Sequence, residues 1–322
     1  MTQHIATQHT APNRRHWLRT LPLPLLEAGL LLTWSSGFIG ARFSIDYAPA
    51  LLVVFWRCIV VCLLLFPFVF RALRNTPFTV LMTHAGIGLL AMAGYLTGVT
   101  QGIALGVPAG LAALCADLLP LGMALLAALA LGERLARQVW FGLIVGLLGV
   151  LWVTHNALVL GAAPWWAYGL PVAGMLSLAV ATLWQKRTRA QPMGLLPNLW
   201  LQCFVSCFAF AAIEGSQGSL APVGSAGFTL SVLWTVALST LGGYGLYWLC
   251  LRRSSATRVA SVLYLSPPIT LLWAWAMFDE PLSWQMGLGM AISATGIWLV
   301  VRAEARQAEA ESCPSISGAA CG

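Results

Sequence analysis

The sequence predicts an all-α integral membrane protein, with ten transmembrane helices arranged as two inverted five-helix repeats. Three observations carry this prediction: the composition, the length of the apolar segments and an internal sequence repeat. The chain has 322 residues, of which 59% are hydrophobic and only 8% are charged. Soluble globular domains carry about 25% charged residues. The apolar segments repeatedly reach the roughly 20 residues that a helix needs to cross a bilayer.

Ten segments are long and apolar enough to be spans. Short linkers separate them, and these linkers contain the Pro, Gly, Asn and Asp residues that are typical of helix ends. The segments outside the spans are polar: residues 1–22 precede them, and residues 302–322 form a tail that we expect to be disordered. The predicted spans are residues 24–44, 49–70, 79–103, 107–131, 138–155, 164–186, 195–214, 228–251, 256–278 and 283–301.

The basic residues predict the orientation of the chain. With a cytoplasmic N-terminus, ten spans place all 17 Lys and Arg residues on the cytoplasmic side except Arg42 and Arg57. Such an excess of basic residues is typical of cytoplasmic loops. We therefore expect a multi-pass protein of the cell inner membrane with both termini in the cytoplasm. The net charge of +7 then reflects orientation rather than a nucleic-acid partner. The opposite loops carry Asp46, Glu214, Asp279 and Glu280.

Residues 109–153 resemble residues 256–300 without a gap, at a constant offset of 147 positions. Such a repeat indicates a duplicated half, with residues 24–155 as the first half and residues 164–301 as the second. Five spans per half is an odd number, so the halves have opposite orientations. Many secondary transporters use this arrangement to build two alternating gates around a central site. The paired residues include Pro120 and Pro267, Glu133 and Glu280, Gln138 and Gln285, Gly142 and Gly289, and Gly149 and Gly296.

Three motifs resemble those of a known family. They are Trp34-Ser-Ser-Gly-Phe-Ile-Gly in the first span, Phe55-Trp-Arg57 in the second, and the two Pro…Glu-x-Leu…Gly…Gly blocks. Together they resemble the EamA family, the ten-helix branch of the drug/metabolite transporter (DMT) superfamily, over residues 24–301. The resemblance implies a transporter that exports its substrate. It does not choose among amino acids, other metabolites and drugs.

Two prolines, Pro120 and Pro267, lie near the middle of the fourth and ninth spans. Proline removes a backbone donor and kinks a helix. Interrupted helices at matching positions of two halves point to a transport site. A structural kink far from the substrate is the alternative interpretation.

Asp117 is the one carboxylate deep inside a span, and Arg57 is the one deep basic residue. Burial favours the neutral form of a carboxyl, which would suit proton coupling. The alternative is a static ion pair between Asp117 and Arg57 that joins two helices. Both interpretations remain open from the sequence.

Aromatic side chains near mid-span are further candidates for the site. Tyr264 occupies the repeat position of Asp117, so both are expected to face one cavity. Tyrosine combines a stacking face with a hydrogen-bonding tip. The alternative for all of them is ordinary helix packing. The candidates named for substrate binding are Trp34, Tyr95, Tyr244 and Tyr264.

Enzyme signatures such as a phosphate-binding loop, HExxH or GxSxG do not occur in the sequence. We expect no catalytic residue, no metal and no cofactor; Cys58 and Cys62, like Cys203 and Cys207, are interpreted as packing residues. The prediction is a proton-coupled secondary exporter of a small metabolite, amino acid or drug-like compound, as a monomer or homodimer in lipid. The alternatives are a multidrug or sugar/nucleotide-type carrier, a membrane scaffold or an intramembrane enzyme.

Overall fold

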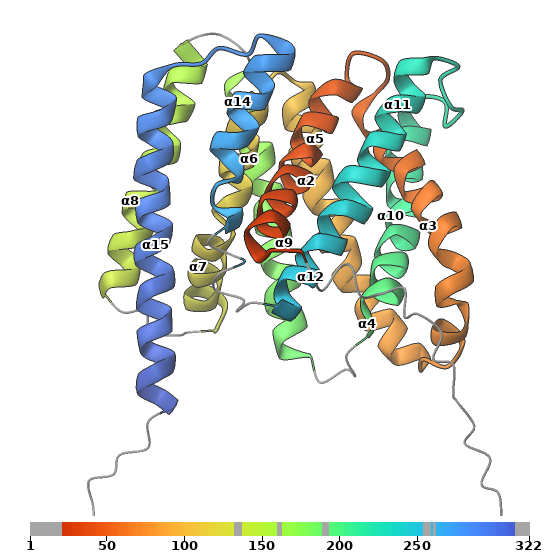
Figure 1. Cartoon of the computed structure of the whole chain (residues 1–322), viewed down its shortest axis with the longest axis horizontal. Helices are drawn as coiled ribbons and strands as arrows, with labels where there is room; N and C mark the ends of the chain where they lie inside the picture. The colour runs from red at the N-terminus through yellow and green to blue at the C-terminus, as the bar shows by residue number, and fades with distance from the viewer. Residues whose placement is uncertain are drawn as a thin grey trace, which may run out of the picture.

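The computed structural model describes residues 21–131, 137–159, 163–188, 193–253, 259 and 262–312, and over these residues the chain is helical without strands (Figure 1). The elements are α2 (Leu23–Ser44), α3 (Ala50–Arg74), α4 (Phe78–Gly88), η1 (Leu89–Gly94), α5 (Tyr95–Ala104), α6 (Ala109–Asp117), α7 (Leu119–Leu131), α8 (Arg137–Val159), η2 (Trp165–Tyr168), α9 (Gly169–Arg187), α10 (Leu195–Gln217), α11 (Ala226–Trp234), η3 (Thr235–Gly243), α12 (Tyr244–Arg253), α14 (Ser266–Phe278) and α15 (Trp284–Ser312).

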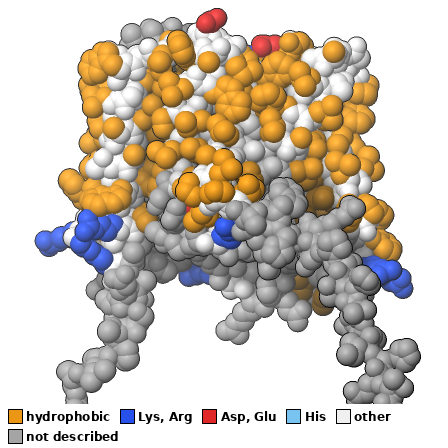
Figure 2. Space-filling model, viewed as in Figure 1, with side chains coloured by type: hydrophobic (Ala, Val, Ile, Leu, Met, Phe, Trp, Pro, Cys, Tyr) orange, Lys and Arg blue, Asp and Glu red, His pale blue; other side chains and the backbone are white. Residues whose placement is uncertain are grey.

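Within these described residues, nine helical stretches are long and apolar enough to cross a membrane. The expected ninth span, residues 256–278, lies partly outside the described residues, and α14 supplies its later part. On the face shown in Figure 2, apolar side chains predominate, with Lys and Arg along the lower edge and Asp and Glu at the upper edge. Membrane proteins have such a surface, with an apolar belt in the hydrocarbon core and polar edges at the two faces of the bilayer. The predicted all-α membrane fold is therefore confirmed.

The fourth and ninth predicted spans are interrupted at equivalent positions. Leu118 separates α6 from α7 with φ −72° and ψ 4°, and Leu265 precedes α14 with φ −84° and ψ −2°. Both residues thus lie in the sparsely populated bridge region of backbone space. Pro120 and Pro267 each fall in the first turn after the break, where the missing N–H of a proline leaves no helical bond unmade.

The hydrogen bonds around the two breaks also match. The Leu118 N–H donates to the Cys115 carbonyl at 3.3 Å, and the Leu265 N–H donates to the Val262 carbonyl at 3.1 Å. Each pair lies 147 positions from its counterpart. The duplication inferred from side chains therefore extends to the backbone, because both halves use the same local interruption.

Two π-helices form a second pair of repeat-related irregularities. η1 lies between α4 and α5, and η3 lies between α11 and α12. The offset of 147 carries residues 89–94 onto residues 236–241, which fall inside η3. Short π-helical turns within α-helices occur frequently at functional sites. No sequence pattern used above predicts them.

Glycines hold α8 against α15, the last spans of the two halves. A Cβ atom added at Gly149 would lie 2.6 Å from the Gly289 carbonyl oxygen, and one at Gly296 would collide with the Gly146 backbone. The Ser293 hydroxyl donates to the Gly146 carbonyl at 3.2 Å. Small residues at this spacing allow two membrane helices to approach closely. The repeated glycines of the sequence therefore join the two halves of one chain.

The last helix is longer than the sequence indicates. α15 continues to Ser312, eleven residues beyond Val301, where the tenth span is predicted to end. Residues 302–312 of the expected disordered tail are thus helical. An Ala- and Glu-rich sequence favours helix, which explains the continuation. The polar N-terminal segment and residues 313–322 lie outside the described residues.

Candidate functional site

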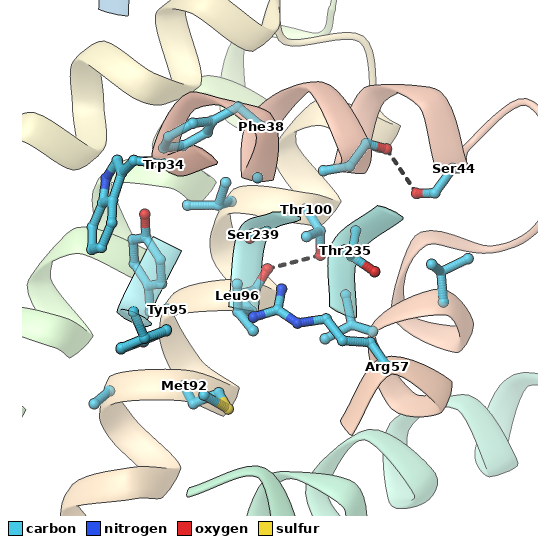
Figure 3. A pocket seen from close by; sticks show the side chains of 17 residues that line it. Trp34, Phe38, Ser44, Arg57, Met92, Tyr95, Leu96, Thr100, Thr235 and Ser239 are labelled. Atoms are coloured by element: carbon cyan, nitrogen blue, oxygen red, sulfur yellow. Dashed lines mark hydrogen bonds between the residues drawn. The ribbon is translucent and has the colours of Figure 1, made fainter. Parts of the chain in front are cut away.

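A cavity lies between helical elements of both halves. Its walls come from α2, α3, η1 with α5, and η3 with the start of α12 (Figure 3). The space open to the centre of a water molecule is about 80 Å³. Roughly 10–15 Å³ of such space holds one water, so the cavity can take a group of several heavy atoms.

Arg57 is the charged residue among the described residues that line this cavity, and no carboxylate lines it. The residue is only 6% exposed, and Figure 3 shows its guanidinium reaching from α3 toward the middle of the cavity. Its Nε atom is buried without a hydrogen-bond partner, and no described residue forms an ion pair with Arg57. Because Arg stays protonated in proteins, the cavity contains a positive charge that the described protein atoms leave uncompensated.

Aromatic side chains form one wall of the cavity. Trp34 packs against Tyr244, with ring centroids 6.2 Å apart, and Tyr95 lines the same cavity (Figure 3). Tyr95 and Tyr244 are each the first residue after a π-helix. The structure thus brings together four of the residues that the sequence proposes for the site, namely Trp34, Arg57, Tyr95 and Tyr244.

The other four proposed residues lie beside the cavity rather than in its wall. Asp117, Pro120, Tyr264 and Pro267 are at the helix breaks, where α6 packs against α14. Pro267 is buried and the other three are half-buried. The Ser35 hydroxyl lies 3.4 Å from the Ser266 carbonyl oxygen and links α2 to the second break. We expected both breaks to line one cavity, but neither break lines this cavity.

Asp117 and Arg57 do not form the static ion pair that the sequence left open. Neither residue takes part in a salt bridge within 4.0 Å among the described residues. The Oδ2 atom of Asp117 is buried without a hydrogen-bond partner. Asp117 and Arg57 therefore do not neutralise each other.

Hydroxyl groups in the cavity wall are the functional candidates that sequence reasoning missed. Thr100 donates its hydroxyl proton to the Leu96 carbonyl at 2.7 Å, and Thr235 donates to the Ser231 carbonyl at 2.9 Å. Their oxygens remain able to accept hydrogen bonds. Ser and Thr are common in membrane helices, so the sequence offers no signal that separates these two from the rest.

Glu280 caps the N-terminus of α6, a helix of the opposite half. Its Oε2 atom accepts a hydrogen bond of 3.0 Å from the Ala109 N–H, at the start of α6. The Arg42 Nε atom lies 3.7 Å from the Glu280 Oε1 atom. Asp279, which adopts a left-handed conformation with φ 53°, turns the chain after α14 toward this contact. The position of Glu133, its repeat partner, lies outside the described residues.

Two duplicated, oppositely oriented halves around a cavity lined from both halves define the fold of a membrane transporter. The model of the EamA-like transporter family matches residues 24–155 and 165–302. The chain therefore belongs to the EamA-like transporter family, and the resemblance seen in its motifs is confirmed.

Relatives of known name are transporters as well. The chain is 26% identical over 281 residues to the probable amino-acid metabolite efflux pump of Escherichia coli (strain K12), covering 84% of this chain and 92% of that protein. It is 26% identical over 283 residues to the inner membrane transporter YedA of the same strain, covering 86% and 90%. A solved crystal structure shares the fold, with a TM-score of 0.56 and 21% identity over 89% of this chain and 98% of that one.

Proposed function

We propose that this protein is a secondary active exporter of small metabolites of the amino-acid class. The observation that carries the proposal is the cavity that both halves line. α6 and α14, which border the two interruptions, pack against α2 of its wall. Alternating access then follows from rocking of one half against the other, with the cavity open to one side at a time. The name of the Escherichia coli efflux pump supports both the substrate class and the direction.

Asp117 is the proposed proton carrier. Its buried and unpartnered Oδ2 atom lies at the end of α6, next to the break at Leu118. A carboxyl in this position can gain or lose a proton when the break changes its exposure to water. Protonation would neutralise a charge that is costly to bury in the membrane. Proton binding and helix movement are thereby coupled.

The test is transport in proteoliposomes with and without an imposed pH gradient. We expect the wild type to move its substrate faster with the gradient, and Asp117→Asn to move it at one rate in both conditions. Asp279→Asn is the matched control, because Asp279 is an exposed carboxylate outside the helices and Asn tolerates its left-handed conformation. An Asp117→Asn protein that still accelerates with the gradient would remove Asp117 from the coupling mechanism.

A further inference from the structure

The proposal in this section deepens the proposed function and rests on it. We propose that Arg57 binds the carboxylate of the transported molecule, and that the cavity selects monocarboxylates with an apolar body over uncharged and cationic analogues. The carboxylate thus supplies the counter-charge that the described protein atoms do not.

The first step of the argument is the isolation of the charge. A buried guanidinium is costly unless an anion and hydrogen-bond acceptors compensate it. Arg57 is 6% exposed, and its Nε atom has no partner. Its side chain is aimed into a cavity rather than into a packed interface (Figure 3). We therefore expect an anion to bind at the Arg57 guanidinium.

The second step concerns the kind of anion. The planar guanidinium fork matches a carboxylate, which it can bind through two parallel hydrogen bonds. One guanidinium balances one negative charge, and no second cation among the described residues lines the cavity. A phosphorylated compound with two negative charges would leave one of them uncompensated in the membrane. The charge of the cavity therefore favours a monoanion.

The third step concerns the rest of the substrate. Most of the remaining wall is apolar, with Phe38, Val54, Met92, Leu96 and Val99 among its residues. No carboxylate of the described residues faces the cavity to hold an ammonium group. The ammonium of a zwitterionic amino acid therefore finds no counter-charge in this wall, so a monocarboxylate that lacks it should bind at least as well. Cationic drugs, which would meet Arg57 without a counter-charge, are disfavoured.

The experiment compares three matched probes on the wild-type protein: leucine, leucinamide and 4-methylpentanoate. Leucinamide lacks the carboxylate, and 4-methylpentanoate lacks the amino group. We expect leucine and 4-methylpentanoate to raise the melting temperature of the detergent-solubilised protein and to leave loaded proteoliposomes, whereas leucinamide does neither. Chloride and inorganic phosphate are tested alone, because a site that responds equally to them is a structural anion site and not a substrate site.

Variants then test the residue. Arg57→Gln should weaken the response to the two acids by roughly tenfold or more, since hydrogen bonds to charged groups are the strong ones. Arg57→Lys keeps the positive charge but cannot form two parallel hydrogen bonds to a carboxylate. Its response to the two acids should therefore fall less than that of Arg57→Gln. Arg71→Gln is the matched control, because Arg71 lies exposed at the other end of the same helix. If Arg57→Gln fails to fold, the comparison of probes on the wild type still decides the question.

The outcomes separate the two proposals. If the wild type exports leucinamide as fast as leucine, it is an exporter and the carboxylate inference is wrong. An Arg57→Gln protein that folds and keeps its preference for the acids also contradicts the inference. If no probe is transported and no carboxylate stabilises the wild type, both the proposed function and the inference fail.

Discussion

Leu118 and Leu265 interrupt two helices in the same way, 147 residues apart, with ψ angles of 4° and −2°. Pro120 and Pro267 follow them at the same distance. An alanine at Pro120 would supply an N–H able to bond the Ala116 carbonyl and so extend the helix across the break. In the second half Pro267 is followed by Pro268, so both prolines must be replaced to allow the same extension.

We expect Pro120→Ala, and the double variant Pro267→Ala with Pro268→Ala, each to slow transport by about threefold to tenfold, which corresponds to roughly 1 kcal/mol in the barrier. Folding, followed by size-exclusion chromatography, should be unchanged. Pro67→Ala is the control, because Pro67 lies exposed inside α3 and away from both breaks. Equal rates in all three variants would show that the interruptions are not needed for movement.

The glycine contacts between α8 and α15 predict a loss of stability on enlargement. A methyl group at Gly149 would lie 2.5 Å from the Ser293 nitrogen and 2.6 Å from the Gly289 oxygen. Overpacking of this kind costs about 1–3 kcal/mol, so Gly149→Ala should lower the melting temperature. Gly287→Ala is the matched control on α15, since nothing lies within 4 Å of the position its Cβ would take. A melting temperature equal to that of the control would contradict close packing here.

The Glu280 cap predicts a pH dependence of stability. Burial raises the pKa of the Glu280 carboxyl, while the Ala109 N–H and Arg42 act in the opposite direction without cancelling the effect. An acid with a raised pKa in the folded state binds protons more tightly when folded, so its contribution to stability falls as the pH rises from about 4.5 through the raised pKa.

Glu280→Gln removes this titration but keeps an oxygen that can accept from Ala109. The melting temperature of the wild type relative to this variant should therefore decline as the pH is raised from 4.5 toward neutrality. Asp46→Asn tests the Arg42 contribution separately, because Asp46 is exposed and pairs with the same Arg42 at 3.0 Å. If the melting temperature of the wild type instead rises relative to that of Glu280→Gln as the pH increases, the Arg42 and Ala109 contacts outweigh the effect of burial on the Glu280 pKa.

The distribution of charge predicts which ends of the molecule face the cytoplasm. Asn75, between α3 and α4, should lie in the cytoplasm, and Ser219, between α10 and α11, should lie outside. In intact cells a membrane-impermeant thiol reagent should label Ser219→Cys and not Asn75→Cys. The reverse pattern would invert the topology and with it the assignment of the Glu280 cap to the outer side.

The fold was predictable because bilayer crossing imposes strong constraints on composition and length, and because Pro120, Glu133 and Gly149 recur at one offset. The irregular elements were not. A π-helix has no distinct apolar pattern in a helix that is apolar on all sides, so η1 and η3 leave no signal in the sequence.

The site was predictable in part for a related reason. Depth along a span is set by counting residues, and Trp34, Arg57, Tyr95 and Tyr244, chosen for their depth, line the cavity. That they bind substrate stays a prediction. The direction that each residue faces depends on how the helices pack, and Asp117 and Tyr264 are not among the residues that line the cavity. The hydroxyls of Thr100 and Thr235 escaped notice because only packing distinguishes them from other Ser and Thr residues.

The two π-helices also govern which side chains the cavity presents. A π-turn accommodates one more residue than an α-turn, and each residue of an α-helix advances the chain by about 100°. Tyr95 and Tyr244 directly follow η1 and η3. If either π-helix relaxed into an α-helix, every residue after it would rotate by about that angle, and its tyrosine would leave the cavity wall. The shape of the binding surface is thus set by the hydrogen-bond register of two backbone segments, as well as by the residues exposed on it.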